Sequence, residues 1–258
     1  MNVRELFDLS GRVAIVTGGG SGIGVQLAEA LAELGADLVL CARRPERCEE
    51  VAERLTAEHG VRALGLRCNV GDPEEVDELV RRTVAELGRI DIVVNNAGTS
   101  WGAPALEMPL DGWQKVLSVN LTGVFLVSQA AGRVMVEQGG GKIVNVASAA
   151  AFVGERPELM DAVGYTASKG GVVAFTRDLA VKWARYGITV NALAPGWFPT
   201  EMAEKVLERG GDGLLDGIPL GRFGGADDLK GAIALLASRA GDFITGTTIH
   251  VDGGQTAN

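Results

Sequence analysis

A tyrosine and a lysine lie four positions apart in residues 165–169. Residues spaced i and i+4 share one face of a helix, and a cation close to a phenol favours its ionised form. A free tyrosine titrates near pH ~10, so Lys169 is expected to lower the pKa of Tyr165 enough for acid–base chemistry near neutral pH. The same spacing is common on amphipathic helices without any function, so the pair needs support from the rest of the chain.

A glycine-rich loop follows the first predicted strand. Residues 12–16 form a short apolar, β-branched run, which is typical of a strand buried on both faces. The loop Gly18-Gly19-Gly20-Ser21-Gly22-Ile23-Gly24 comes next and leads into the amphipathic residues 25–34. In this context glycines let the backbone approach a pyrophosphate, whose charge the start of the helix attracts. The order predicts a dinucleotide site; the alternative is a turn that only connects strand and helix.

The end of the second predicted strand bears on the choice of cofactor. Residues 37–42 read as this strand, and Arg43 and Arg44 follow it. NAD enzymes of this design place an acidic residue here for the ribose 2′-hydroxyl, whereas an arginine can pair with a 2′-phosphate. We therefore expect NADP as the preferred cofactor, with NAD as the alternative. Against this, Ser21 stands where a second basic residue could have helped, and the two arginines could be a solvated helix start.

Size and charge exclude several classes of protein. The chain has 258 residues, a mass of 26.9 kDa and 47% hydrophobic residues, enough for one domain with a large core. Its net charge is −9 and its basic residues are scattered, so it lacks the basic stripe that nucleic acid or an anionic membrane requires. We expect a small-molecule partner, with no nucleic-acid and no membrane partner.

Cysteine and histidine usage indicates the compartment and excludes two site types. Cys41, Cys48 and Cys68 form no Cys-x-x-Cys motif and read as reduced thiols. His59 and His250 are the only histidines, so we expect no metal site and no Ser-His-acid hydrolase. Residues 1–8 lack a signal-peptide apolar region, and no run of about 18 apolar residues occurs. These features predict a soluble, cytoplasmic protein.

Strands and helices alternate along the whole chain. Further strands are predicted at residues 61–68, 90–94, 141–146, 188–194 and 247–251, and further helices at residues 45–58, 73–87, 110–138, 165–186 and 227–240. This alternation predicts an α/β fold with a parallel sheet. A stretch of about residues 196–219, with a short helical piece near residues 201–208, is rich in Gly, Pro and large apolar side chains. Such a mixture suits a movable flap over a site.

Polar and small residues stand where predicted strands end. The fourth strand runs into Asn95-Asn96-Ala97-Gly98, and Ser148 follows the fifth strand. Ligands of open α/β sheets bind at the carboxyl ends of the strands. Asn120 lies among apolar residues of the predicted helix 110–138, so its amide needs partners if it is buried. It is either a local structural cap or a functional polar group.

Together with Pro195-Gly196, these motifs resemble the short-chain dehydrogenase/reductase family in order and spacing over nearly the whole chain. The resemblance implies a Rossmann-like, doubly wound sheet of seven parallel strands with helices on both faces. It also implies a catalytic tetrad of Asn120, Ser148, Tyr165 and Lys169. In that scheme hydride passes between nicotinamide C4 and the substrate carbinol carbon, while Tyr165 exchanges the proton of the substrate oxygen. Ser148 would hydrogen-bond that oxygen, Lys169 would hold the nicotinamide ribose, and Asn120 would position a water that links Lys169 to solvent.

The resemblance further implies the residues that contact the cofactor. Asn69 falls where the family usually has aspartate against the adenine, and its side-chain carbonyl can still accept a hydrogen bond. Thr200 would reach the nicotinamide carboxamide or the neighbouring phosphate. The full implied set is Gly18, Ser21, Gly22, Ile23, Gly24, Arg43, Arg44, Asn69, Val70, Asn96, Ala97, Gly98, Tyr165, Lys169, Pro195, Gly196 and Thr200.

The segment before Tyr165 is unusual for the family. Tyr165 follows Ser148 by 17 residues, a few more than is common, and the extra length falls in residues 154–161. This variant resembles gluconate 5-dehydrogenase-like and 3-oxoacyl-carrier-protein reductase-like members. The candidate substrate contacts are Trp101, Ser148, Met160, Trp197 and Phe198. The apolar side chains in this set favour a hydrophobic ketone or a 3-oxoacyl group, and a sugar acid or polyol is the alternative.

Two expectations concern the whole molecule. Family members are usually tetramers, so the resemblance implies a homotetramer. A different class of function, a dinucleotide-sensing protein without catalysis, would keep the fold and lose the chemistry. The presence of all four tetrad residues argues against it, because a sensor needs neither Ser148 nor Tyr165.

Overall fold

The fold is built on one sheet of seven parallel strands. The computed structural model describes residues 2–257, except for the side chains of residues 205, 208–210 and 212. The strands lie in the order β3-β2-β1-β4-β5-β6-β7. Their bounds are β1 Val13–Thr17, β2 Asp37–Ala42, β3 Ala63–Arg67, β4 Ile92–Asn95, β5 Gly141–Val146, β6 Ile188–Pro195 and β7 Thr248–Val251. The predicted α/β fold with a Rossmann-like, doubly wound sheet is confirmed.

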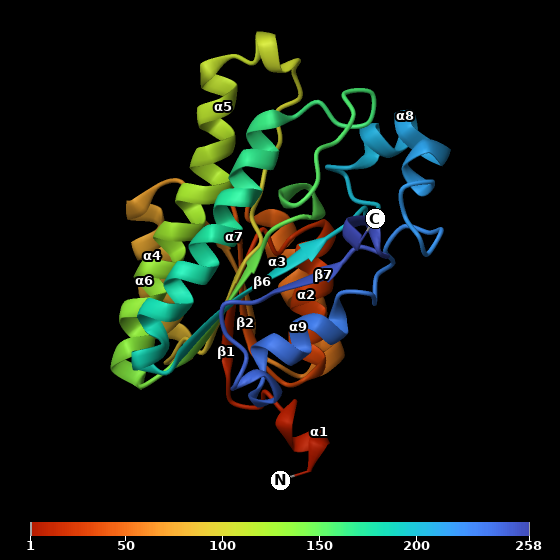
Figure 1. Cartoon of the computed structure of the whole chain (residues 1–258). Coiled ribbons are helices and arrows are strands. Elements are labelled where there is room, and N and C mark those ends of the chain that lie inside the picture. The colour runs from red at the N-terminus through yellow and green to blue at the C-terminus, as the bar shows by residue number, and fades with distance from the viewer. Residues whose placement is uncertain (1, 258) are drawn as a thin grey trace.

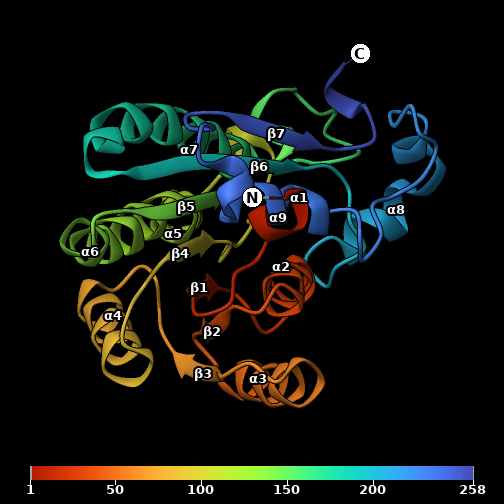
Figure 2. The ribbon, with the colours of Figure 1, turned by 90° about the horizontal axis from the view of Figure 1, so that it is seen from below.

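Helices cover both faces of this sheet. Figure 2 shows α4, α5, α6 and α7 on one face and α2, α3 and α9 on the other. The helices of the described chain are α1 Val3–Leu6, α2 Gly22–Glu33, α3 Glu46–His59, α4 Pro73–Leu87, α5 Leu110–Leu117, α6 Gly123–Gln138, α7 Val163–Trp183, α8 Glu204–Leu215 and α9 Lys230–Ala237. Helix α8 stands off the sheet beyond the carboxyl ends of the strands (Figure 1).

Side chains of each central strand enter two separate cores. Along β1, Val13 and Ile15 belong to the core under α4 and α6, whereas Ala14 and Val16 belong to the core under α2 and α9. All of β1 is buried, as expected for a parallel strand covered on both faces. This explains why the sequence shows continuous apolar runs rather than alternation.

The long helix predicted over residues 110–138 is interrupted. A π-helical turn at Ser118–Thr122 joins α5 to α6 and contains Asn120. Such turns often occur at functional sites. By length and composition Leu110–Gln138 could span a membrane, but α6 packs on α4 and on β4 and β5, as a core helix does.

Candidate functional site

Two adjoining cavities lie at the carboxyl ends of the strands. The smaller, of about 180 Å³, is lined by the glycine loop, the end of β4, the end of β5 and the start of α7. The larger, of about 690 Å³, is lined mainly by residues 155–162 and the segment after β6. Both are lined by Ile23, Ser148, Tyr165, Gly196, Thr200 and Met202. Tyr165 and Ser148 therefore stand at the junction of a narrow cleft and a wider chamber.

In the glycine loop, backbone atoms occupy the space that side chains would need. A Cβ on Gly24 would overlap the carbonyl oxygen of Gly18, and Gly22 has φ +53°, which favours glycine. Thr200 covers the loop, since a Cβ on Gly22 would lie 3.1 Å from its methyl carbon. Helix α2 begins at Gly22, so its free N–H groups face the smaller cavity. This cradle fits the pyrophosphate of a dinucleotide.

Asn96 locks the loop to β4. Its Nδ2 donates to the carbonyl oxygens of Thr17 (2.9 Å) and Gly18 (3.2 Å). The Thr17 hydroxyl in turn accepts from the backbone N–H groups of Asn96 and Ala97, each at 3.0 Å. Hydrogen bonds between the end of β1 and the end of β4 thus hold together two parts of the lining of the smaller cavity, the glycine loop and the segment that begins at Asn96.

Tyr165 and Lys169 lie on one face of α7, as the spacing predicts. Lys169 Nζ is 5.6 Å from the Tyr165 ring centroid and donates to the carbonyl oxygen of Val146 at 2.7 Å. The pKa of Tyr165 is nevertheless raised, because burial outweighs the opposing effect of the neighbouring Ser148 hydroxyl. The pKa of Tyr165 is therefore raised overall rather than lowered, contrary to the sequence-based expectation.

Lys169 is only 4% exposed, and burial lowers its pKa to about 8. An unfolded lysine titrates near pH ~10.4. Between these two pH values the unfolded chain binds a proton that the folded chain lacks, so the free energy of unfolding rises with pH. The burial of charged Lys169 thus costs stability at neutral pH, and that cost disappears as the lysine loses its proton.

We expect the ligand-free wild type to gain stability relative to Lys169→Met, by on the order of 2 kcal/mol, between about pH 7.5 and about pH 9.5. Urea unfolding of both proteins at the two pH values measures this change. A stability difference between the two proteins that does not change with pH would contradict it.

The Asn120 side chain is fully buried and makes three hydrogen bonds within the protein. Its Oδ1 accepts from the backbone N–H of Thr99 at 2.8 Å. Its Nδ2 donates to the carbonyl oxygen of Thr99 at 2.9 Å and to the Ser168 hydroxyl at 3.0 Å. Asn120 therefore ties the segment after β4 to α7, directly beside Lys169. These bonds give the buried amide the partners it needs, and the catalytic role implied by the resemblance stays a prediction.

Four of the expected cofactor residues lie outside the smaller cavity. Arg43 and Arg44 are exposed directly after the end of β2, and β2 pairs with β1, which leads into the glycine loop. The side-chain Oδ1 of Asn69 accepts from the backbone N–H of Gly71 at 3.3 Å, closing a turn after β3. Val70 is buried against α6. The cavity lining contains all the other expected cofactor residues, and also Val146, Ala147, Glu201 and Met202, which were not among them.

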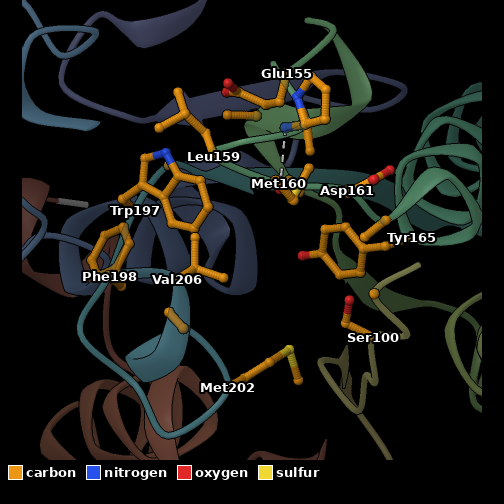
Figure 3. Close-up of a pocket in the computed structure, with 18 of the residues that line it drawn as sticks. Ser100, Glu155, Leu159, Met160, Asp161, Tyr165, Trp197, Phe198, Met202 and Val206 are labelled. Atoms are coloured by element: carbon orange, nitrogen blue, oxygen red, sulfur yellow. Dashed lines mark hydrogen bonds between the residues drawn. The ribbon is translucent and has the colours of Figure 1, made fainter. Parts of the chain in front are cut away.

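Four of the five expected substrate residues line the larger cavity: Ser148, Met160, Trp197 and Phe198. Figure 3 shows Tyr165 and Ser100 on one side of this space, with Trp197, Phe198 and Val206 on the other. Trp101 is the exception. A Cβ on Gly112 would lie 2.9 Å from its indole, and Lys115 Nζ lies 5.3 Å from its ring centroid. Trp101 packs on α5 and is not among the residues that line the larger cavity.

Known proteins resemble the chain over its full length. Residues 18–256 match the family described as enoyl-(acyl carrier protein) reductase. Gluconate 5-dehydrogenase of Gluconobacter oxydans (strain 621H) is 40% identical over 100% of both chains. D-threitol dehydrogenase of Mycolicibacterium smegmatis (strain ATCC 700084 / mc(2)155) is 42% identical over 97% of this chain and 95% of that protein.

A solved structure shares the fold closely. The gluconate 5-dehydrogenase from Burkholderia cenocepacia J2315, in complex with NADP and tartrate, matches with a TM-score of 0.94, 39% identity and 100% of each chain covered. The family match, the full-length relatives and the shared fold agree with the order of motifs along this sequence. The chain belongs to the short-chain dehydrogenase/reductase family.

Proposed function

We propose that the protein is an NADPH-preferring oxidoreductase that interconverts a carbonyl compound and a secondary alcohol. The observation that carries this proposal is the position of Tyr165 and Ser148, which line both the cleft beside the glycine loop and the larger cavity. A nicotinamide cofactor in the cleft and a carbonyl compound in the larger cavity would then meet at these two side chains. When bound, the cofactor supplies or accepts the hydride.

In the direction of reduction, Tyr165 donates its proton to the substrate oxygen as hydride reaches the carbonyl carbon. The raised pKa of Tyr165 in the ligand-free protein keeps the phenol protonated before reaction. Ser148 hydrogen-bonds the same oxygen and holds it against the phenol. Lys169, with its pKa lowered to about 8, still carries its charge at neutral pH and stabilises negative charge that develops on Tyr165. In the oxidation of an alcohol each step runs in reverse.

Asn120 completes the proposed tetrad as a positioning residue. Its side chain bonds Thr99 and Ser168, and Ser168 directly precedes Lys169. Because all of these bonds are made within the protein, its amide holds α7 in place.

Cofactor preference is the second part of the proposal. Arg43 and Arg44 follow β2, whose neighbour β1 leads into the glycine loop, and an arginine there can pair with a 2′-phosphate. Several similar solved structures contain NADP, which supports this assignment.

We expect Arg43→Ala to lower kcat/KM for NADPH by roughly 10-fold to 100-fold, the value of a hydrogen bond to a charged group, with little change for NADH. Steady-state kinetics with both cofactors measure this. Arg81→Ala, which removes an exposed arginine from α4, serves as the matched control. An equal loss with NADH, or better use of NADH by the wild type, would overturn the preference.

The lining of the larger cavity favours a substrate with an apolar carbon skeleton. Leu159, Trp197, Phe198 and Val206 line it, so we propose a hydrophobic ketone or acyl compound in preference to a sugar acid or polyol. A turnover panel of keto-acyl thioesters, cyclic ketones and keto-sugar acids with NADPH tests the function. Activity on at least one class is expected. Absence of turnover with every compound class would favour the alternative function, a dinucleotide sensor.

We further propose a cytoplasmic homotetramer. Helices α6 and α7 expose apolar side chains at Phe125, Val136, Val163 and Val181, and such exposure on two adjacent helices suits contact with another copy of the chain. The three cysteines are free and buried, as suits a reducing compartment.

A further inference from the structure

The larger cavity carries charge of one sign. Three acidic residues line it: Glu155, Glu158 and Asp161. Among the side chains that the structure describes, no lysine, arginine or histidine joins them. All three belong to the lengthened segment between Ser148 and Tyr165. Carboxylates are ionised at neutral pH, and a concave surface lined by one sign of charge concentrates ligands of the opposite sign.

Glu155 is the carboxylate that the fold holds in place. Its Oε1 accepts from Gln255 Nε2 at 2.9 Å. Gln255 also lines the cavity and begins a 3₁₀ turn, Gln255–Ala257, near the C-terminus. Asp252 anchors this turn, since its Oδ2 accepts from the backbone N–H of Thr256 at 2.9 Å and from the Thr256 hydroxyl at 2.6 Å. Two distant segments thus fix Glu155 at the cavity wall.

Gln255 orients this carboxylate. Because a carboxylate only accepts hydrogen bonds, the Glu155 contact assigns the Gln255 N–H₂ group and leaves its carbonyl oxygen on the other side. That oxygen is buried beside Gly196, where an added Cβ would lie 3.1 Å from it. Glu155 therefore supplies the oriented acceptor at this end of the cavity.

We propose that this cavity selects a substrate with an ammonium group, which Glu155 binds while the substrate carbonyl lies at Tyr165. This inference rests on the proposed function and names its substrate class. Figure 3 places Glu155 and Tyr165 at different sides of the space, with Leu159, Trp197 and Val206 on the side away from Tyr165. The apolar wall would contact the carbon skeleton that joins the two polar ends.

The proposal separates this chain from relatives named for gluconate. A carboxylate in the same chamber would meet three like charges and none of opposite sign among the described side chains, and unpaired like charges strongly disfavour a ligand. We therefore expect anionic keto acids to be poor substrates, although the chain is 40% identical to a gluconate 5-dehydrogenase.

Three cyclic ketones of similar size and different charge test the proposal: 1-methylpiperidin-4-one as the cation, cyclohexanone as the neutral compound and 4-oxocyclohexanecarboxylate as the anion. We measure kcat/KM for each with NADPH at neutral pH, and Kd for each by calorimetry with the NADP-loaded protein. The expected order is cation above neutral above anion, with roughly 10-fold or more between the cation and the anion. A preference for the anion, equal values for all three, or binding of none would overturn the proposal.

Two variants show whether Glu155 causes the order. Glu155→Gln keeps a hydrogen-bonding group beside Gln255 and removes the charge, so kcat/KM for the cation should fall roughly 10-fold while that for cyclohexanone stays within about twofold. Glu137→Gln removes the same charge from an exposed position on α6 and should leave both values unchanged. An equal fall for both ketones in Glu155→Gln would contradict a role in charge selection.

The two measurements separate this inference from the proposed function. Cation-selective binding without turnover of any ketone would support the ammonium site and count against the oxidoreductase. Turnover with similar kcat/KM values for the cationic, neutral and anionic ketones would support the oxidoreductase and contradict the ammonium site.

Discussion

Tyr165→Phe is expected to lower kcat by about 10²-fold to 10⁴-fold, the range typical of a lost general acid or base. The substitution removes only the hydroxyl, so the phenyl ring keeps its packing and its position beside Lys169. Because the glycine loop is untouched, Kd for NADPH should change by less than about threefold. Stopped-flow and steady-state rates with an active ketone, together with fluorescence titration of NADPH, measure both quantities.

The chain offers a matched control for this substitution. Tyr186 is the only other tyrosine, and its hydroxyl accepts a hydrogen bond from Arg185 at 2.7 Å just beyond the C-terminal end of α7. Tyr186→Phe removes the same atom far from both cavities and should keep wild-type turnover. Activity retained in Tyr165→Phe at the level of Tyr186→Phe would show that another group transfers the proton.

The second large effect is expected from Gly24→Ala. A Cβ at this position would overlap the Gly18 carbonyl oxygen and would lie 2.6 Å from Asn96 Nδ2, so the loop has to move away from β4. Overpacking of this kind costs about 1–3 kcal/mol of stability. Displacement of the loop should also weaken NADPH binding by more than about tenfold, because the backbone N–H groups no longer converge on the pyrophosphate. Urea unfolding and NADPH titration test the two effects.

Gly231→Ala is the control for the change of residue type. Gly231 lies in α9, where an added Cβ would meet open space, with no neighbouring side chain or strand within 4 Å. Alanine is a better helix former than glycine by about 0.8–1.0 kcal/mol, so this variant should be slightly more stable and bind NADPH normally. If Gly24→Ala behaved like Gly231→Ala, the loop would not be the tight cradle described above.

Local signals explain why much of the fold was predictable. Helix α4 has the bounds expected from sequence, because Asp72 caps its start, Pro73 occupies the first turn and Gly88 ends it with φ +86°. The motif residues Ser148, Tyr165 and Lys169 meet because parallel strands and the helices after them begin and end at the same edge of the sheet. Each of these features depends on short stretches of sequence.

Features that depend on tertiary packing were not predictable in the same way. The pKa of Tyr165 is raised because the folded chain buries it, and residue spacing carries no measure of burial. Trp101 could equally have faced the cavity or α5, and only the position of Gly112 decides this. Gln255 lies 100 residues from Glu155 along the chain, so no local pattern connects them. The contact between Glu155 and Gln255 in the larger cavity is therefore visible only in the folded structure.

Transfer of deuterium from NADPH that carries deuterium at both C4 positions tests whether Tyr165 and the cofactor reduce a carbonyl together. With a ketone from the active class, we expect the product alcohol to carry one deuterium on its carbinol carbon, detected by mass spectrometry, and we expect Tyr165→Phe to form almost none of this product while still binding NADPH. Consumption of the labelled cofactor without deuterium in the alcohol, or full product formation by Tyr165→Phe, would contradict it.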